Sequence, residues 1–153
     1  MNKRARKIAI IGGQVASDKD FQIAYETGKM IAEQGDILIC GGRAGIMEAA
    51  AKGSYEAGGL TIGILPGIDD SDVNPYIKIS LPTGVGLARN SIIACAADGA
   101  IAISGHYGTL SEIAFCKQFQ TPVCSLNSWQ IKGVAARKSP QEALSYLEEE
   151  MQL

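Results

Sequence analysis

The chain has 153 residues, of which 46% are hydrophobic and 20% are charged, so it is long enough and apolar enough to enclose one core. We therefore expect residues 1–153 to form a single domain. The formal net charge of −2 argues against nucleic-acid binding, which needs a basic surface, and no apolar run is long enough to cross a membrane.

Cysteine and histidine usage argues against a metal site. The four cysteines show no C-x-x-C spacing and His106 is the single histidine, so neither a zinc site nor a disulfide framework is expected. Reduced, mostly buried cysteines in a cytoplasmic protein are the better interpretation. The basic leader, residues 1–7, is predicted to be a solvated tail, because the apolar stretch behind it is too short for a signal peptide.

The first elements alternate between strand and helix. Residues 8–11 form an apolar run closed by Gly12-Gly13, which predicts a buried strand and a turn. A helix is predicted over 20–34, where apolar residues recur at helical spacing, and Gly35 ends it. The apolar run 37–40 predicts the second strand.

The middle of the chain repeats this alternation. A helix is predicted over 45–57 and a strand over 61–65. A polar loop rich in aspartate then runs to Pro75, and a shorter strand is predicted over 77–81.

The last third continues in the same way. Helices are predicted over 89–97 and 109–119, with strands over 100–103 and 123–126. Ser139-Pro140-Gln141-Glu142 opens the final helix, because serine caps a helix start, proline suits its first position and glutamate completes a capping box.

These elements define the fold class. Strands that are apolar throughout are buried on both faces, and helices between them produce a parallel sheet. The sequence therefore predicts an α/β, Rossmann-like, doubly wound and mainly parallel sheet flanked by helices on both faces. In such sheets ligands bind outside the carboxyl ends of the strands, where we expect the glycine loops to gather.

Two glycine turns follow the first two strands. Gly41-Gly42-Arg43 lies between a strand and a helix, where glycine lets a ligand approach the backbone and the free amides of the helix start favour an anion. Gly12-Gly13 provides a similar, weaker cradle, although both turns are also explained by tight turning alone. Neither turn matches G-x-G-x-x-G or the P-loop, which disfavours an NAD-dependent enzyme.

The loop 104–112, Ser-Gly-His-Tyr-Gly-Thr-Leu-Ser-Glu, is the most informative stretch. It leaves a buried strand, turns on two glycines and enters a helix with hydroxyl groups in its first turn, an arrangement that suits a phosphate. Glu112 is either a catalytic carboxylate or, with Thr109, half of a capping box. His106 is expected to be a loop residue or a hydrogen-bond donor, since no partner metal ligands accompany it.

Arg89 opens a helix after the turn at Thr83-Gly84. A cation is not favoured near a helix N-terminus, so Arg89 is expected to meet an anion or a carboxylate, with a solvated arginine as the alternative.

Taken together, these stretches resemble the LOG-like, Rossmann-type superfamily, often labelled "possible lysine decarboxylase", across most of the chain. Segment 41–47, Gly-Gly-Arg-Ala-Gly-Ile-Met, is similar to its glycine motif after the second strand, and 104–112 is similar to its P-G-G-x-G-T-x-x-E signature. Arg89 stands at the spacing where the cytokinin-activating phosphoribohydrolases of this superfamily carry an arginine paired with the signature glutamate, here Glu112.

A narrower likeness points to one branch of the superfamily. Segments 61–67 and 82–90, with the aspartate-rich loop between them, resemble the small molybdenum cofactor carrier proteins, which hold a phosphorylated pterin without converting it. Two positions depart from the signature, because Ser104 replaces its proline and His106 replaces its second glycine. These departures argue against hydrolase activity, whereas the presence of Arg89 and Glu112 argues for it.

The resemblance implies a binding protein that holds molybdenum cofactor, or a related AMP-like nucleotide, and passes it to a recipient such as a molybdoenzyme. The alternative is a phosphoribohydrolase that cleaves the N-glycosidic bond of a nucleoside 5'-monophosphate, with Arg89 and Glu112 as catalytic residues. A purely structural module would leave the glycine loops unexplained. The expected ligand and phosphate contacts are Gly12, Gly13, Gly41, Gly42, Arg43, Thr83, Gly84, Arg89, Asn90, Ser104, Gly105, His106, Tyr107, Gly108 and Thr109.

Self-association is also expected. Apolar residues of the helices 89–97 and 109–119 exceed what one sheet face covers, and relatives form dimers or dimers of dimers, so we expect a homodimer or homotetramer. The residues concerned are Ile92, Ile93, Ala96, Ile113 and Phe115.

Overall fold

The computed structural model describes residues 4–151 and contains one sheet of parallel strands, in the order β4-β3-β2-β1-β5-β6-β7. The strands are β1 (Lys7–Ile11), β2 (Ile37–Cys40), β3 (Thr61–Leu65), β4 (Ile79–Pro82), β5 (Gly99–Ile103), β6 (Val123–Leu126) and β7 (Ala135–Arg137). The helices are α1 (Asp18–Glu33), α2 (Ile46–Glu56), α3 (Arg89–Ala96), α4 (Tyr107–Phe119) and α5 (Pro140–Glu150), with a short 3-10 turn, η1 (Gly86–Ala88), before α3. The predicted fold class is confirmed.

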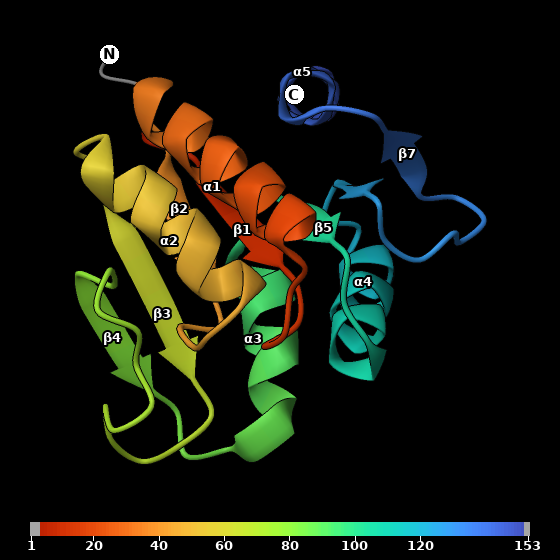
Figure 1. Ribbon diagram of the computed structural model, residues 1–153. Coiled ribbons are helices and arrows are strands. Elements are labelled where there is room, and N and C mark those ends of the chain that lie inside the picture. Colours follow the sequence, from red (N-terminus) through yellow and green to blue (C-terminus); the bar gives the residue numbers. More distant parts are fainter. Residues whose placement is uncertain (1–3, 152–153) are drawn as a thin grey trace.

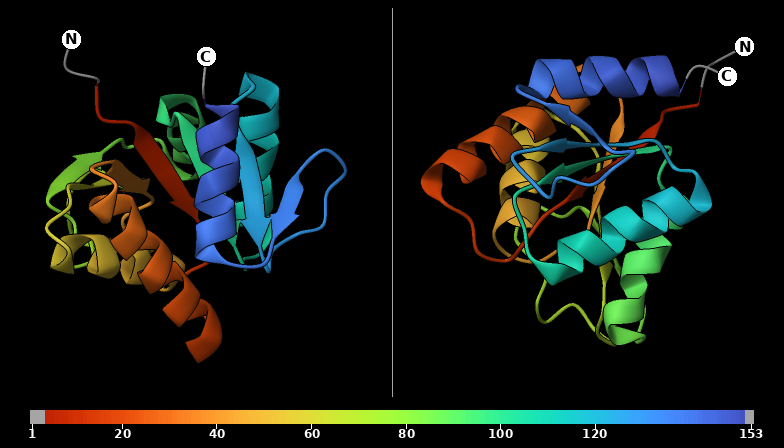
Figure 2. Two further views of the ribbon diagram at one scale, coloured as in Figure 1. Left: turned by 90° about the horizontal axis from the view of Figure 1, so that it is seen from above. Right: turned by 90° about the vertical axis from the view of Figure 1, so that its right-hand side faces the viewer.

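Helices cover both faces of the sheet (Figures 1 and 2). One face packs against α1, α2 and α5 and receives Ile8 and Ile10 of β1. The other face packs against α3 and α4 and receives Ala9 and Ile11. Because successive residues of a strand point to opposite faces, burial on both sides explains why these strands are apolar at every position.

The strand order reverses at β1. From β1 the chain moves through β2 and β3 to the edge strand β4, then returns through α3 to β5 on the other side of β1. The loops after β1 and β5 therefore leave neighbouring strands in opposite directions. This point at the carboxyl edge is where open α/β sheets bind ligands.

The basic leader differs in part from the prediction. Lys7 is the first residue of β1, and Arg6 is largely buried in ion pairs with Asp36, at 2.8 Å, and with Glu148 of α5. Arg6 thus ties the start of β1 to Asp36 and to α5, whereas Arg4 and Ala5 are exposed, as the prediction of a solvated tail requires. Residues 1–3 of the leader lie outside the described residues.

One strand was missed and several element boundaries also differ from the prediction. Strand β7 was not predicted, because an edge strand of three residues, Ala-Ala-Arg, has no apolar run to reveal it. Helix α4 begins at Tyr107, two residues before the predicted start at Thr109. The final helix begins as expected, since the Ser139 side chain accepts a hydrogen bond from the Glu142 amide at 3.1 Å.

Cys40, Cys116 and Cys124 are buried as expected, whereas Cys95 is exposed, and all four thiols are free. Within residues 4–151, no helix is long and apolar enough to cross a membrane.

Candidate functional site

A cleft of about 290 Å³ opens at the carboxyl edge of the sheet, where the loops after β1, β2, β3 and β5 meet the starts of α3 and α4. Its walls are Gly12, Gly13, Gln14, Val15, Arg43, Met47, Pro66, Leu87, Arg89, Asn90, His106, Gly108, Thr109 and Glu112. The topology therefore brings loops that are far apart in sequence to the predicted crevice.

The start of α4 presents free backbone donors to this cleft. His106 occupies the N-cap position without a side-chain cap, and the amides of Tyr107, Gly108 and Thr109 have no hydrogen-bond partner among the described residues. Free amides at a helix start, together with the helix dipole, attract an anion. The predicted capping box between Thr109 and Glu112 does not form, because the helix begins two residues too early for Thr109 to be the cap.

The turn into α4 uses an unusual backbone conformation. Ser104 has a φ of 51° and Gly105 a φ of 100°, so two successive residues lie at positive φ. The ring of proline holds φ near −65°, and proline could not adopt the conformation of Ser104. The backbone conformation at position 104 is therefore one that serine can adopt and that the proline of the resembled signature cannot.

Arg89 is a buried cation at the floor of the cleft. It opens α3 and is only 7% exposed, yet its guanidinium contacts neutral oxygens: Oδ1 of Asn90 at 2.5 Å and the carbonyl of Gly41 at 3.5 Å. Its Nε atom has no hydrogen-bond partner. Desolvation lowers the pKa of Arg89, and a buried cation with neutral partners is stabilised by an incoming anion.

Glu112 lies on the first turns of α4 and faces the same cleft. It is 6% exposed and makes no hydrogen bond or salt bridge among the residues that the structure describes. Burial raises the pKa of Glu112 to about 8, although the nearby charge of Arg89 acts in the opposite direction. Burial therefore favours the protonated carboxyl group, which is able to donate a hydrogen bond.

A polar chain fixes Arg89 relative to α4. Asn90 accepts a hydrogen bond from Arg89 and donates one to Ser111 Oγ at 3.1 Å, and Ser111 donates to the carbonyl of Gly108 at 2.6 Å. The guanidinium is thereby connected to the first turn of α4, which carries the free amides. Asn90 thus has a positioning role as well as lining the cleft.

Thr109 completes the group of buried polar atoms at the cleft. It is 2% exposed and its Oγ1 has no hydrogen-bond partner. An unpaired buried hydroxyl costs about 1–3 kcal/mol, a cost that is removed when a ligand supplies the partner. Thr109, Arg89 and Glu112 therefore form a set of three buried polar side chains with unfilled hydrogen-bonding capacity on one cleft.

The glycine turn after β2 supports the site from behind. A side chain at Gly41 would lie 2.7 Å from the Arg89 guanidinium, so glycine is needed there for Arg89 to pack against the turn. The Gly42 carbonyl accepts a hydrogen bond from the amide of Asn74, at 2.9 Å. Of this turn, only Arg43 lines the cleft.

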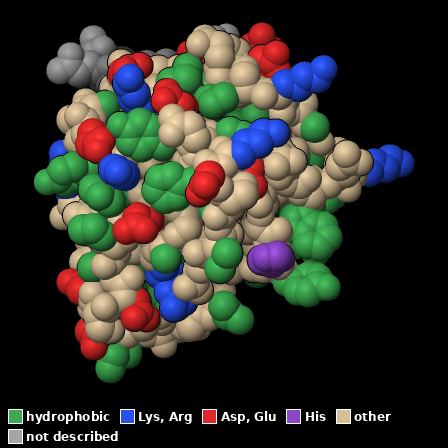
Figure 3. All heavy atoms as spheres, in the orientation of Figure 1, with side chains coloured by type: hydrophobic (Ala, Val, Ile, Leu, Met, Phe, Trp, Pro, Cys, Tyr) green, Lys and Arg blue, Asp and Glu red, His purple; other side chains and the backbone are tan. Residues whose placement is uncertain are grey.

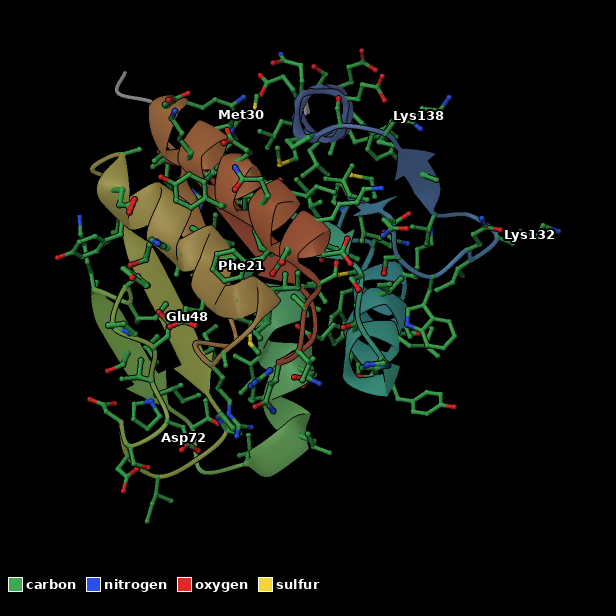
Figure 4. The ribbon with its side chains drawn as sticks, in the orientation of Figure 1. Phe21, Met30, Glu48, Asp72, Lys132 and Lys138 are labelled. Carbon is green, nitrogen blue, oxygen red and sulfur yellow. The ribbon has the colours of Figure 1, made fainter. Side chains whose placement is uncertain are left out.

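Arg43 is partly neutralised by the aspartate-rich loop. Its guanidinium lies 3.7 Å from the carboxylate of Asp72, which is labelled in Figure 4. Asp72 lies on the loop between β3 and β4. Asn74 of the same loop donates to the carbonyl of Arg43 at 2.9 Å. The loop therefore folds back onto the turn after β2 and holds the backbone of Arg43.

Several other predicted residues lie beside the cleft rather than in its wall. The Thr83 hydroxyl donates to the carbonyl of Leu65 at 2.7 Å, and Gly84 donates to Gly67 at 2.8 Å, so both fasten the ends of β3 and β4 together. Ser104 and Gly105 line a neighbouring hollow, and Tyr107 is 80% exposed on the rim.

The cleft wall also contains residues that were not predicted. Gln14, Val15, Met47, Pro66 and Leu87 line it. Gln14, Val15 and Pro66 directly follow predicted strands or the glycines that close them. Their position at the carboxyl edge of the sheet could therefore have predicted that they line the cleft. Met47 and Leu87 were noted only within resembled motifs, and their side-chain direction depends on how α2 and η1 pack.

Comparison with known proteins agrees with this geometry. Residues 5–153 match the model of the SLOG cluster4 family. The chain belongs to this family. An uncharacterized protein of Archaeoglobus fulgidus is 40% identical over 141 residues, which cover 92% of this chain and 93% of that protein.

Solved structures place this member of the SLOG cluster4 family near the molybdenum cofactor proteins. The molybdenum cofactor binding protein from Rippkaea orientalis is 34% identical, with a TM-score of 0.91 over 95% of this chain and 97% of that one. The Moco carrier protein from Chlamydomonas reinhardtii is 31% identical, with a TM-score of 0.88 over 97% of this chain and 98% of that one. The predicted superfamily and the likeness to the carrier branch are confirmed, while the lysine decarboxylase label stays untested.

Proposed function

We propose that this protein binds a phosphate-bearing small molecule, molybdenum cofactor or a related nucleotide such as AMP, and hands it on unchanged. The observation that carries the proposal is the convergence of unpaired buried polar groups, Arg89 Nε and Thr109 Oγ1, with the free amides at the start of α4. A phosphate offers several acceptor oxygens and negative charge, so it can satisfy all of these donors at once.

The part of the cargo that adjoins the phosphate fits the remaining walls. Val15, Met47 and Leu87 are apolar, and Val15 and Leu87 are 79% and 82% exposed at the mouth. Such a cleft, polar at its floor and apolar at its mouth, suits a ligand with an anionic end and an organic body. We place the phosphate at the α4 amides, with Arg89 and Thr109 as side-chain partners.

Equilibrium binding tests the proposal. Purified protein is titrated with molybdenum cofactor under anaerobic conditions and separately with AMP, and micromolar binding of at least one is expected. Arg89→Gln should weaken binding at least about 10-fold, because a hydrogen bond to a charged group contributes about 1.5–3 kcal/mol.

Lys132→Gln is the matched control for that experiment. Lys132 lies on the exposed loop before β7, away from the cleft (Figure 4), and its replacement removes the same charge. The control should bind like the unmodified protein. Failure of the unmodified protein to bind either probe at micromolar concentration contradicts the proposal.

The second candidate function is the phosphoribohydrolase, and Glu112 is the observation that favours it. A buried carboxyl group whose pKa is raised to about 8 can protonate the leaving base during cleavage of an N-glycosidic bond. AMP and water would yield adenine and ribose 5-phosphate. Because burial favours the protonated form of Glu112, this role is that of a general acid.

Release of free adenine separates the two functions. AMP is incubated with the unmodified protein and with Glu112→Gln, and the products are separated by chromatography. Bound but intact AMP in both samples supports the carrier. Adenine release that disappears in Glu112→Gln supports the hydrolase and overturns the carrier proposal.

A further inference from the structure

A second hollow adjoins the cleft at the carboxyl ends of β5 and β6. It has a volume of about 360 Å³ and is lined by Ser104, Gly105, His106, Asn127, Ser128 and Trp129. His106 lines both the hollow and the cleft, so the two lie on either side of the loop that enters α4. Nothing in the carrier proposal so far uses this hollow.

Trp129 lines the hollow and forms an aromatic pair with the exposed Tyr107 beside it. Trp129 donates its Nε1 hydrogen to the His106 carbonyl at 3.0 Å and packs against the core beneath α3 and α4. The Tyr107 ring lies 5.9 Å from the Trp129 ring at an interplanar angle of 32°. Figure 3 shows hydrophobic side chains projecting beside the single histidine on this face. The indole is thus held in place while the pair remains open to solvent.

Hydrogen bonds fix the orientation of the polar side chains that line the hollow. Asn127 donates from Nδ2 to Oδ1 of the buried Asp20 at 3.0 Å, and because Asp20 can only accept, the amide oxygen of Asn127 is left free as an acceptor. Ser128 donates to the carbonyl of Ser104 at 2.6 Å. The backbones of Ser104 and Asn127 both lie at a φ of 51°, and the Ser104 amide donates to the Asn127 carbonyl at 3.1 Å.

We propose that this hollow binds the planar heteroaromatic ring of the ligand whose phosphate lies at the start of α4. The inference rests on the proposed function for the position of the phosphate. The ring stacks on Trp129 and Tyr107, and a ring N–H or amino group donates to the free oxygen of Asn127. Stacking on fixed aromatic side chains suits any heterocycle with a π-face, and the Asn127 oxygen selects rings that carry a donor.

The chain provides its own reporter for this contact. Trp129 is the single tryptophan in the sequence, so intrinsic indole fluorescence observes the hollow and nothing else. Titration with AMP, ribose 5-phosphate and inorganic phosphate then separates ring binding from phosphate binding. AMP is expected to quench the emission and to bind about 10-fold more tightly than ribose 5-phosphate, whose binding leaves the emission nearly unchanged.

Two substitutions separate stacking from a purely structural role of Trp129. Trp129→Leu removes the aromatic ring and should weaken AMP binding about 10-fold while changing phosphate binding less than about 2-fold. Trp129→Phe keeps a smaller aromatic ring while removing the hydrogen bond to His106, and it should keep most of the affinity for AMP. Binding to both variants is measured by calorimetry, with circular dichroism as a check of folding.

The outcomes distinguish this inference from the function on which it rests. Phosphate binding without any preference for AMP over ribose 5-phosphate overturns the ring site and leaves the phosphate site intact. An equal loss of AMP and phosphate affinity in both variants also overturns it, because Trp129 would then act only by holding the loop. Absence of binding by all three probes overturns both the ring site and the phosphate site on which it rests, and the titration with molybdenum cofactor then decides the proposed function.

Discussion

Single atoms determine what the cleft attracts. The guanidinium of Arg89 is buried against neutral oxygens, and the hydroxyl of Thr109 is buried without a partner. Each of these groups would be more stable in water than in its present surroundings unless a ligand completes its hydrogen bonds. Individual side chains therefore determine the expected affinity of the cleft and the pH dependence of stability.

Replacing Thr109 by valine tests the unpaired hydroxyl directly. Thr109→Val keeps the shape of the side chain and removes the donor, so affinity for AMP or inorganic phosphate should fall about 5- to 10-fold, whereas stability should not fall. Calorimetric titration and thermal unfolding measure the two quantities. Thr121→Val is the control, because its hydroxyl donates to the Ala94 carbonyl at 2.8 Å, so that variant should lose stability but not affinity.

Glu112 makes stability depend on pH. Its pKa in the folded chain is about 8, above the ordinary value of 4.5, so the folded protein binds the proton more tightly than the unfolded chain does. Its contribution is fully present below about pH 4.5 and is lost as pH rises to about 8. Glu112→Gln should remove this dependence, so its melting temperature relative to the unmodified protein should rise between pH 5 and 8.5. A constant difference across this range would contradict the raised pKa.

At the scale of elements, α1 and α2 are held together by close backbone contact. A side chain at Gly28 of α1 would lie 1.9 Å from the Ala50 carbonyl of α2, and one at Gly53 of α2 would lie 2.0 Å from the Tyr25 carbonyl of α1. The two helices thus cross where each carries a glycine. Because α2 begins next to the cleft, this contact also sets the position of Met47.

Gly28→Ala should therefore force α1 and α2 apart. Overpacking of this kind costs about 1–3 kcal/mol, even though alanine favours helix formation more than glycine does. The free energy of unfolding in urea measures the effect. Gly67→Ala is the control, because no atom lies within 4 Å of its added carbon and its φ is not positive, so its stability should change little.

At the scale of the whole molecule, we propose self-association through α3 and α4. Ile93 and Ile113, named in the prediction, are fully buried against the sheet and cannot contribute to an interface. Ile92 is 39% exposed, and Phe119 is 45% exposed with its ring stacked 6.0 Å from Phe115. An apolar surface of this kind favours contact with a second copy.

Light scattering after size-exclusion chromatography measures that association. The unmodified protein should elute as a dimer or tetramer, and Ile92→Glu should shift it toward the monomer, because a charge in an apolar contact is costly. Lys132→Gln should leave the mass unchanged. A monomeric mass for the unmodified protein would remove the predicted interface.

The sequence by itself determined the layered α/β fold and the edge of the sheet where the loops meet. Strands that are apolar at every position require burial on both faces, and helices between them favour parallel pairing. The alternation of apolar runs and helical patterns along the chain was therefore enough to predict the fold. The same reasoning named Arg89, Asn90, Thr109 and Glu112, and all four line the cleft. It missed β7, because three residues at an edge carry no pattern.

Only the tertiary structure decided which of the glycine loops face the cleft and which support it. Gly41 and Thr83 lie behind the wall, whereas Met47 and Leu87 form part of it, since side-chain direction depends on how helices pack on the sheet. Because α4 begins at Tyr107, Thr109 lies inside the helix and does not cap it, and its hydroxyl is buried without a hydrogen-bond partner. The burial of a side chain and its hydrogen-bond partners depend on residues that are distant in sequence, so a local sequence pattern cannot predict them.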